Sequence, residues 1–263
     1  MNNATTSPQV IVSLTSFPAA IPYAVEAIRS VLNGSVLPDK VVLYLDTQKF
    51  PDGILPTELE DLKAECPIFE VRFDEAEIRS YKKLIPALRD FPNDIIVTID
   101  DDIAYHSNML RDLVRLNKQF PNAIIAHRVR KAILNAPYRK WRKYKFYDFI
   151  FKKYHFDYHA MQTGVGGVLY PPHALDEEML DSSLFMSMAP TNDDIWFWTA
   201  AVSKGTYVIP VPGWHPKLIE IGKPGEFALK TVNLKSGDDR NREALGKILK
   251  HYPTIKQRIE NGR

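Results

Sequence analysis

The strongest constraint on the fold is the alternation of strand-like and helix-like segments along residues 10–120. Apolar, β-branched runs predict strands at residues 10–14, 40–45, 69–73 and 94–99. Helical spacing of apolar residues predicts helices at residues 21–32, 58–64, 80–89 and 110–120. Strands that alternate with helices form a parallel sheet covered by helices on its faces. The sequence therefore predicts an α/β fold.

Proline and glycine mark several boundaries of these elements. Pro22 suits the first turn of its helix, Asn33-Gly34 ends that helix, and Pro86 is expected to kink or shorten the helix around it. The second half is less regular. It predicts a turn and strand at 162–169, a helix within 191–201, a strand at 207–211 and a helix at 242–258 that breaks at Tyr252-Pro253.

Composition excludes several classes of protein. The 263 residues carry a net charge of only +2, so overall charge does not indicate a polyanionic partner. The single cysteine, Cys66, excludes an intrachain disulfide and a cysteine-based zinc site. The polar N-terminus lacks a secretory pattern, and no apolar stretch reaches the ~20 residues of a membrane helix. We therefore expect a soluble, cytoplasmic protein.

An acidic triplet, Asp100 to Asp102, follows the fourth predicted strand. If the backbone stays extended, the side chains of Asp100 and Asp102 point the same way. Adjacent carboxylates repel each other unless a cation joins them, and Mg²⁺ or Mn²⁺ prefers such oxygen ligands together with phosphate. The alternative is a solvated loop that caps the next helix. The apolar strand before the triplet favours the metal site, where the cation would stabilise a diphosphate leaving group.

Other polar residues follow the earlier strands. Thr15 and Ser16 end the first strand, and Asp46 ends the second. Because ligands of parallel sheets bind at the carboxyl ends of strands, we expect these residues and the triplet to line one crevice.

Three segments in this order resemble the GT-A class of glycosyltransferases: VSLTSFP, IIVTIDDD with its D-x-D, and TNDDIWFW. SYKKLIPAL and GVGGVLYPP also resemble family-2-like bacterial enzymes of capsule and lipopolysaccharide assembly. The resemblance spans residues 10–216. It implies one GT-A-like domain over residues 1–263, with a Rossmann-type, mostly parallel sheet. The nucleotide-sugar half would cover about 8–120 and the acceptor half about 121–263.

The resemblance also assigns roles to the first acidic cluster. It implies that Asp100 and Asp102 bind Mn²⁺ or Mg²⁺ and that Asp101 faces the nucleotide sugar. His215, in the loop PGWHP, matches the position of a further metal ligand. A lone loop histidine is more often structural, and the neighbouring Trp214 suits either stacking on a ligand or core packing.

A second acidic pair, Asp193 and Asp194, precedes an aromatic helix. Acidic residues suit the first turn of a helix, and Thr191 or Asn192 could cap it, so a purely structural role is one interpretation. By resemblance to inverting GT-A enzymes, Asp194 takes the position of the catalytic base and Asp193 that of its neighbour. The pair is Asp-Asp here, whereas Glu-Asp is commoner in that class.

Lysines and glycines complete the candidate site. Lys82 or Lys83 could pair with a donor phosphate, although solvated surface lysines are the alternative. Gly164, Gly166 and Gly167 lack the spacing of a dinucleotide fingerprint. We expect Gly166 and Gly167 to let the backbone approach the donor sugar or acceptor closely, with a tight turn as the alternative.

Residues 128–158 are basic, with ten Lys or Arg against two Asp and with interleaved aromatics. No nucleic-acid-binding motif accompanies them. Contact with an anionic membrane at the inner face of the cell membrane is one interpretation, and aromatics packed into the core are the other.

The sequence thus predicts an inverting glycosyltransferase that moves a sugar from a nucleotide-diphosphate donor to a hydroxyl of a bacterial surface glycan or lipid-linked acceptor. A retaining transferase, a sugar nucleotidyltransferase and a non-catalytic glycan-binding domain are the alternatives. The nucleotidyltransferase is disfavoured because no glycine-rich loop follows the first strand.

Overall fold

The computed structural model describes residues 7–144, 157–212, 218–221 and 239–262. A seven-stranded sheet forms the centre of the protein. The strand order is β3-β2-β1-β4-β9-β6-β10. These strands are β3 (Phe69–Asp74), β2 (Lys40–Asp46), β1 (Val10–Thr15), β4 (Ile95–Thr98), β9 (Val168–Tyr170), β6 (Ile124–Ala126) and β10 (Val208–Pro210). Only β9 runs antiparallel to its neighbours, β4 and β6. The predicted α/β class with a mostly parallel sheet is confirmed.

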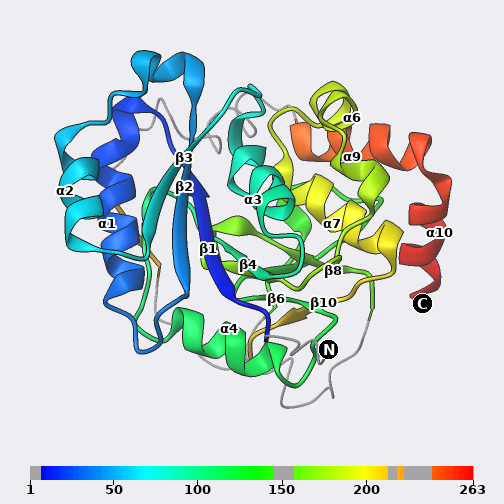
Figure 1. Cartoon of the computed structure of the whole chain (residues 1–263). Helices are drawn as coiled ribbons and strands as arrows, with labels where there is room; N and C mark the ends of the chain where they lie inside the picture. The colour runs from blue at the N-terminus through cyan, green and yellow to red at the C-terminus, as the bar shows by residue number, and fades with distance from the viewer. Residues whose placement is uncertain (1–6, 145–156, 213–217, 222–238, 263) are drawn as a thin grey trace, which may run out of the picture.

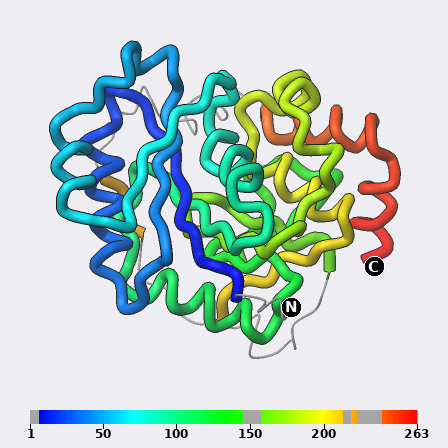
Figure 2. Tube along the Cα trace, viewed as in Figure 1, coloured from blue at the N-terminus to red at the C-terminus, as the bar shows by residue number. Residues whose placement is uncertain are grey.

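Helices cover both faces of this sheet (Figures 1 and 2). One face packs against α1 (Ile21–Leu32), α2 (Thr57–Glu65) and α4 (Met109–Asn117). The other packs against α3 (Ile85–Asp90), α6 (Ser182–Met188), α7 (Asp193–Lys204), α9 (Arg240–His251) and α10 (Pro253–Asn261). Alternation along each strand feeds both layers: Ile11 joins the second layer and Val12 the first. Strands buried on both faces explain the continuous apolar runs.

Two small sheets flank the main one. β5 (Ile103–Ala104) pairs with β11 (Ile219–Glu220), and β7 (Val129–Lys131) pairs with β8 (Ala160–Gln162). Both pairs are antiparallel and both lie next to segments that enter the candidate site.

Proline positions divide the helices as chain geometry requires. The helix expected over residues 80–89 is shortened at Pro86, as predicted: Arg79–Lys83 forms a 3-10 turn, and α3 then begins with Pro86 in its first turn. Proline lacks the N–H that a helix interior needs, but the first turn leaves that group unbonded. Pro22 opens α1 and Pro253 opens α10 in the same way, which confirms the break after α9.

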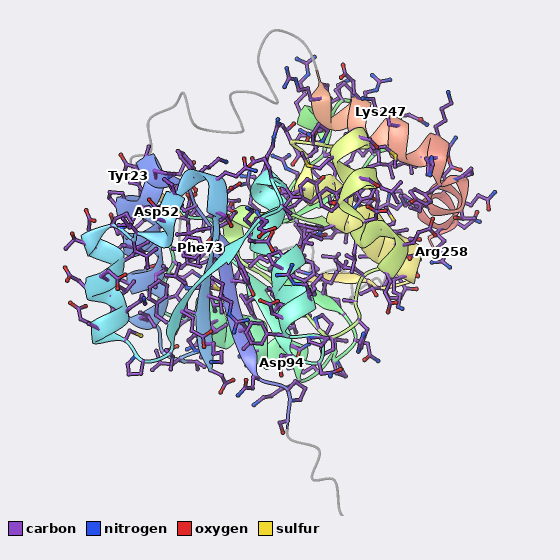
Figure 3. All side chains as sticks on the ribbon, turned by 45° about the horizontal axis from the view of Figure 1, so that its top comes forward. Tyr23, Asp52, Phe73, Asp94, Lys247 and Arg258 are labelled. Carbon is purple, nitrogen blue, oxygen red and sulfur yellow. The ribbon has the colours of Figure 1, made fainter. Side chains whose placement is uncertain are left out.

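Helix α7 is buried on nearly every side and carries the second acidic pair at its first turn. Trp196 Nε1 donates to the Met179 carbonyl at 2.7 Å and Trp198 Nε1 to the Tyr158 carbonyl at 3.0 Å. Arg258 of α10, labelled in Figure 3, donates to the Val202 carbonyl at 2.8 Å near the other end of α7. A rigid, enclosed helix therefore holds Asp193 and Asp194 in place.

No helix in the described ranges is both long and apolar enough to cross a membrane.

Candidate active site

The candidate site lies at the carboxyl ends of β1 and β4. The order β2-β1-β4 places the second strand on one side of β1 and the fourth on the other, so the strand order reverses there. Thr15 and Ser16 end β1, and Asp100 follows β4. In Figure 3, Asp52, which follows β2, and Asp94, which precedes β4, mark the carboxyl and amino ends of the parallel strands.

The acidic triplet is not extended, contrary to the sequence-based expectation. β4 ends at Thr98, and Asp101 and Asp102 form a turn that leads into β5. Asp101 is buried and accepts a hydrogen bond from Ser16 Oγ at 2.7 Å. Asp100 instead faces Lys83, whose Nζ lies 2.8 Å from its Oδ1. Because of this turn, the neighbouring carboxylates of Asp100 and Asp101 contact different side chains.

Tyr105 holds the backbone of this turn in place. Its hydroxyl accepts a hydrogen bond from the Asp100 backbone N–H at 2.8 Å. Burial, then the charge of Asp100 and more weakly that of Asp102, raise the pKa of Tyr105 well above its usual value. The phenol thus stays protonated, with Asp100 and Asp102 both within electrostatic reach.

Lys83 joins the two acidic clusters. Its Nζ contacts Asp100 Oδ1 at 2.8 Å and Asp193 Oδ2 at 2.9 Å, and its side chain is only 9% exposed. Burial alone lowers the pKa of Lys83, but the charges of Asp100 and Asp193 hold it well above its usual value. The Lys83 carbonyl also accepts a hydrogen bond from Ser13 Oγ at 2.6 Å, which ties it to β1. A permanent cation therefore sits between carboxylates far apart in sequence.

Gly164 occupies the centre of this arrangement. Its N–H donates to Asp194 Oδ1 at 2.9 Å. A Cβ at this position would lie 2.8 Å from Lys83 Nζ and 3.3 Å from the Oδ1 atoms of both Asp100 and Asp194. Only glycine leaves room for this convergence.

The two glycines predicted to bind the donor have different surroundings. A Cβ at Gly166 would lie 3.0 Å from Arg128 Cβ, so Gly166 is also a close-approach position at the site. Gly167 has φ +86°, and a Cβ there would meet Met109 Sδ of α4 at 3.0 Å. A side chain at position 167 would therefore contact helix α4.

Asp194 has a strongly perturbed acidity. Burial and the charges of Asp193 and Asp100 raise the pKa of Asp194 to about 7, although Lys83 and the Gly164 N–H oppose the shift. A carboxylate tuned to the working pH can accept a proton efficiently. No side-chain cap from Asn192 precedes the pair, so the capping expected of Thr191 or Asn192 does not take the usual form.

The remaining predicted donor residues make contacts within the protein. Lys82 is buried, with Nζ 3.2 Å from Asp46 Oδ2 and 3.0 Å from the Asp74 carbonyl. Asp46 Oδ1 accepts from the Gln48 N–H at 2.8 Å, and Thr15 Oγ1 donates to the Tyr44 carbonyl at 2.8 Å. Neither Lys82 nor Lys83 is a solvated surface lysine. Lys83 enters the acidic cluster, whereas Lys82 braces the end of β2.

The carboxylates of the acidic triplet are of the ligand type that a hard divalent cation prefers. Among the residues that the structure describes, no three His, Cys, Asp or Glu side chains converge as a metal site. Trp214 and His215 lie outside the described residues. Asp100 and Asp102 offer carboxylate oxygens, the type of ligand that Mn²⁺ and Mg²⁺ take together with substrate phosphates.

The basic segment divides into buried and exposed parts. Trp141 belongs to the core, and Tyr144 packs against it, as the structural interpretation predicts. The cations between and beside them are exposed: Arg139, Lys140, Arg142 and Lys143. Residues 145–156 lie outside the described residues.

Comparison with solved structures identifies the fold. The chain is similar over 98% of its length to a mannosyltransferase from Pyrobaculum calidifontis in complex with GDP-Man and Mn²⁺. The match covers 74% of that chain, with a TM-score of 0.52 and 14% sequence identity. The fold is GT-A-like. No family model matches the sequence, and a search of curated proteins gave no match.

Proposed function

We propose that the protein transfers a sugar from a nucleoside diphosphate to an acceptor hydroxyl with inversion at the anomeric carbon. The observation that carries the proposal is the convergence of Asp100 and Asp194 around Gly164, at the carboxyl ends of the strands. A neighbour in fold that binds GDP-Man and Mn²⁺ supports it. On this proposal, residues 8–120 supply most of the donor site and residues 121–263 most of the acceptor site.

The donor side of the site is the β1 and β4 edge. Asp100 and Asp102 would hold Mn²⁺ or Mg²⁺, which when bound supplies Lewis-acid stabilisation of the diphosphate. The Ser16 hydrogen bond keeps Asp101 inside the turn, and Tyr105 keeps the Asp100 backbone in place. Preorganised groups of this kind stabilise developing charge without rearranging during the reaction.

Asp194 is the base in this proposal. Its carboxylate takes the proton of the acceptor hydroxyl as that oxygen forms a bond to the anomeric carbon. The bond from that carbon to the phosphate oxygen breaks, and its electron pair leaves with the nucleoside diphosphate. Lys83 forms an ion pair with Asp193, and on this proposal Asp194 is the carboxylate that accepts the proton.

The acceptor would be a hydroxyl of a bacterial surface glycan or of a lipid-linked saccharide, used on the cytoplasmic side of the membrane. The exposed basic residues of the 139–143 segment suit contact with anionic headgroups there.

Donor binding tests the metal site directly. We expect wild-type protein to bind GDP or UDP more tightly with Mn²⁺ than without it. Asp102→Ala should lose this Mn²⁺-dependent gain, because one of two carboxylate ligands is removed. Isothermal titration calorimetry with each nucleotide, with and without Mn²⁺, measures the effect.

Asp61→Ala is the matched control, since Asp61 is an exposed residue of α2. It should retain the full Mn²⁺-dependent gain. Equal nucleotide affinity in Asp102→Ala and wild type, in the presence of Mn²⁺, would remove Asp102 from the metal site.

Vesicle binding tests the membrane contact. Replacing Arg139, Lys140, Arg142 and Lys143 with Gln should strongly reduce co-sedimentation with phosphatidylglycerol vesicles, because each cation near an anionic surface contributes about 1 kcal/mol. Binding to phosphatidylcholine vesicles should be weak in both proteins. Identical sedimentation of variant and wild type with anionic vesicles would contradict membrane contact through this segment.

A further inference from the structure

Two arginines next to the proposed base have no role in the chemistry described above. Arg128 precedes β7 and Arg130 lies within it, so their side chains leave the same side of an extended segment. Val129 between them is buried in the core, which directs both arginines away from it. The Thr163 N–H donates to the Arg128 carbonyl at 2.9 Å, which connects this strand to the loop that carries Gly164.

Arg130 is oriented but not neutralised. Its Nη1 donates to the Trp141 carbonyl at 2.7 Å, and its guanidinium lies 4.8 Å from the ring centroid of Tyr138. The backbone N–H of Tyr138 in turn donates to Asp239 Oδ2 at 2.6 Å. These contacts hold the guanidinium in one place, and none of them is with a carboxylate.

Neither arginine forms an ion pair with any carboxylate in the described ranges. The Nε atoms of both are buried and have no hydrogen-bond acceptor in the part of the chain that the structure describes. Burial and the neighbouring charge of Arg130 lower the pKa of Arg128. Two adjacent, partly buried cations with unused donors are unfavourable unless an anion binds between them.

The position of the pair decides which substrate would bring that anion. A Cβ at Gly166 would touch Arg128, which places Arg128 beside the glycine loop. The same loop carries Gly164, whose N–H donates to Asp194 Oδ1 at 2.9 Å. Arg128 therefore lies beside the loop that contacts the proposed base. The base faces the acceptor.

We propose that Arg128 and Arg130, bordered by Tyr138, bind an anionic group of the acceptor, either a sugar carboxylate or a phosphate. Guanidinium groups suit both, because their planar donors match carboxylate and phosphate oxygens in pairs. This subsite rests on the proposed function, because only in a transferase is the bound molecule an acceptor. It would select acidic saccharides or phosphate-linked acceptors over neutral sugars.

Anion binding with the donor site already filled tests the subsite. Full-length protein is first saturated with Mn²⁺ and whichever of GDP-mannose or UDP-glucose it binds. Inorganic phosphate, glucuronate and glucose are then titrated separately by calorimetry. We expect saturable binding of phosphate or glucuronate and none of glucose; the stronger of the two anions identifies the source of the charge.

Substitution assigns the anion to the arginines. Arg128→Gln and Arg130→Gln should each weaken that anion at least about tenfold, since charge-assisted hydrogen bonds are lost. Both should keep wild-type affinity for the Mn²⁺-nucleotide sugar, which also shows that they fold. Arg128→Lys should retain part of the anion affinity. Arg139→Gln, in the exposed part of the same segment, should bind the anion as wild type does.

Three results would overturn the subsite. These are the absence of saturable binding of either anion to wild type, normal binding of the anion to Arg128→Gln, and competition between the anion and the nucleotide sugar. The last result would place the arginines in the donor site. Failure of the proposed function is distinguishable, since it would abolish Mn²⁺-nucleotide binding or sugar transfer without removing the anion site.

Discussion

Asp194→Asn is expected to lower sugar transfer by about 10²–10⁴-fold, the usual contribution of a positioned general base. Asparagine keeps the oxygen that accepts the Gly164 N–H, so the local geometry should survive. Affinity for the Mn²⁺-nucleotide should be unchanged, because Asp194 is not a proposed metal ligand. Single-turnover transfer assays beside calorimetry separate the two effects, and NMR of the product's anomeric proton distinguishes inversion from retention.

The pH dependence gives the same substitution a second readout. Because the pKa of Asp194 is raised to about 7, kcat/KM of the wild type should rise as pH increases through 7, where the base becomes ionised. Asp194→Asn should lose this limb from its residual activity. Near-wild-type turnover in Asp194→Asn, or an unchanged pH limb, would exclude Asp194 as the base.

The contribution of Asp194 to the free energy of unfolding should fall over the pH range in which activity rises. The folded-state pKa of Asp194 lies above the unfolded value of about 3.9, so between those pH values the folded protein binds more protons. Unfolding free energy attributable to this group therefore falls as pH rises from 4 to 7. Removing the charge should stabilise Asp194→Asn above pH 7 by about 1–2 kcal/mol, as is common when a functional residue is replaced. Asp61→Asn on the exposed surface of α2 should change neither quantity.

Local pattern predicted most strands of the main sheet, but it did not predict β6 (Ile124–Ala126), whose apolar run is only three residues long. The run at residues 94–99 corresponds to β4, and the spacing of Ile21 and Ile28 corresponds to the buried side of α1. Such signals come from burial and periodicity within a few residues. Boundaries that depend on backbone chemistry were less accessible: Pro86 starts a helix because the segment before it closes into a 3-10 turn.

The arrangement of the candidate site depends on contacts that a linear pattern does not encode. The sequence identified Lys83, Asp100 and Asp193 individually, but not that Lys83 lies between the two carboxylates. The sequence predicts close approach at Gly166 and Gly167 rather than at Gly164, because only the folded chain shows which glycine the acidic side chains approach. Arg128 was one of many basic residues until β7 placed it beside the glycine loop.

Polar residues of the candidate site also divide into two groups that the sequence does not separate. Asp46 and Lys82 satisfy each other inside the protein, as Ser16 and Asp101 do. Asp100 and Asp194 remain partly exposed. Burial distinguishes these groups, and burial depends on contacts between segments that lie far apart in the sequence.

Lys83→Met is expected to destabilise the folded protein by about 3–5 kcal/mol at pH 8, the usual effect of removing one member of a buried ion pair. The ammonium is the shared partner of Asp100 and Asp193, so its loss leaves like charges together around Gly164. The folded-state pKa of Lys83 is raised, which means that its stabilisation is fully present below the unfolded value of about 10.4 and is lost only above it. Urea unfolding at pH 8, with slope and midpoint both fitted, measures the change.

The deficit of Lys83→Met should shrink at pH 5, because carboxylates without their cation protonate more readily as pH falls. Adding Asp193→Asn should recover part of the lost stability, since the double variant removes one of the unpaired charges; a double-mutant cycle isolates that coupling. Lys63→Met provides the matched control on the exposed side of α2 and should stay within about 0.5 kcal/mol of wild type. Wild-type stability of Lys83→Met at pH 8, or no coupling to Asp193, would show that the lysine does not hold the two acidic clusters together.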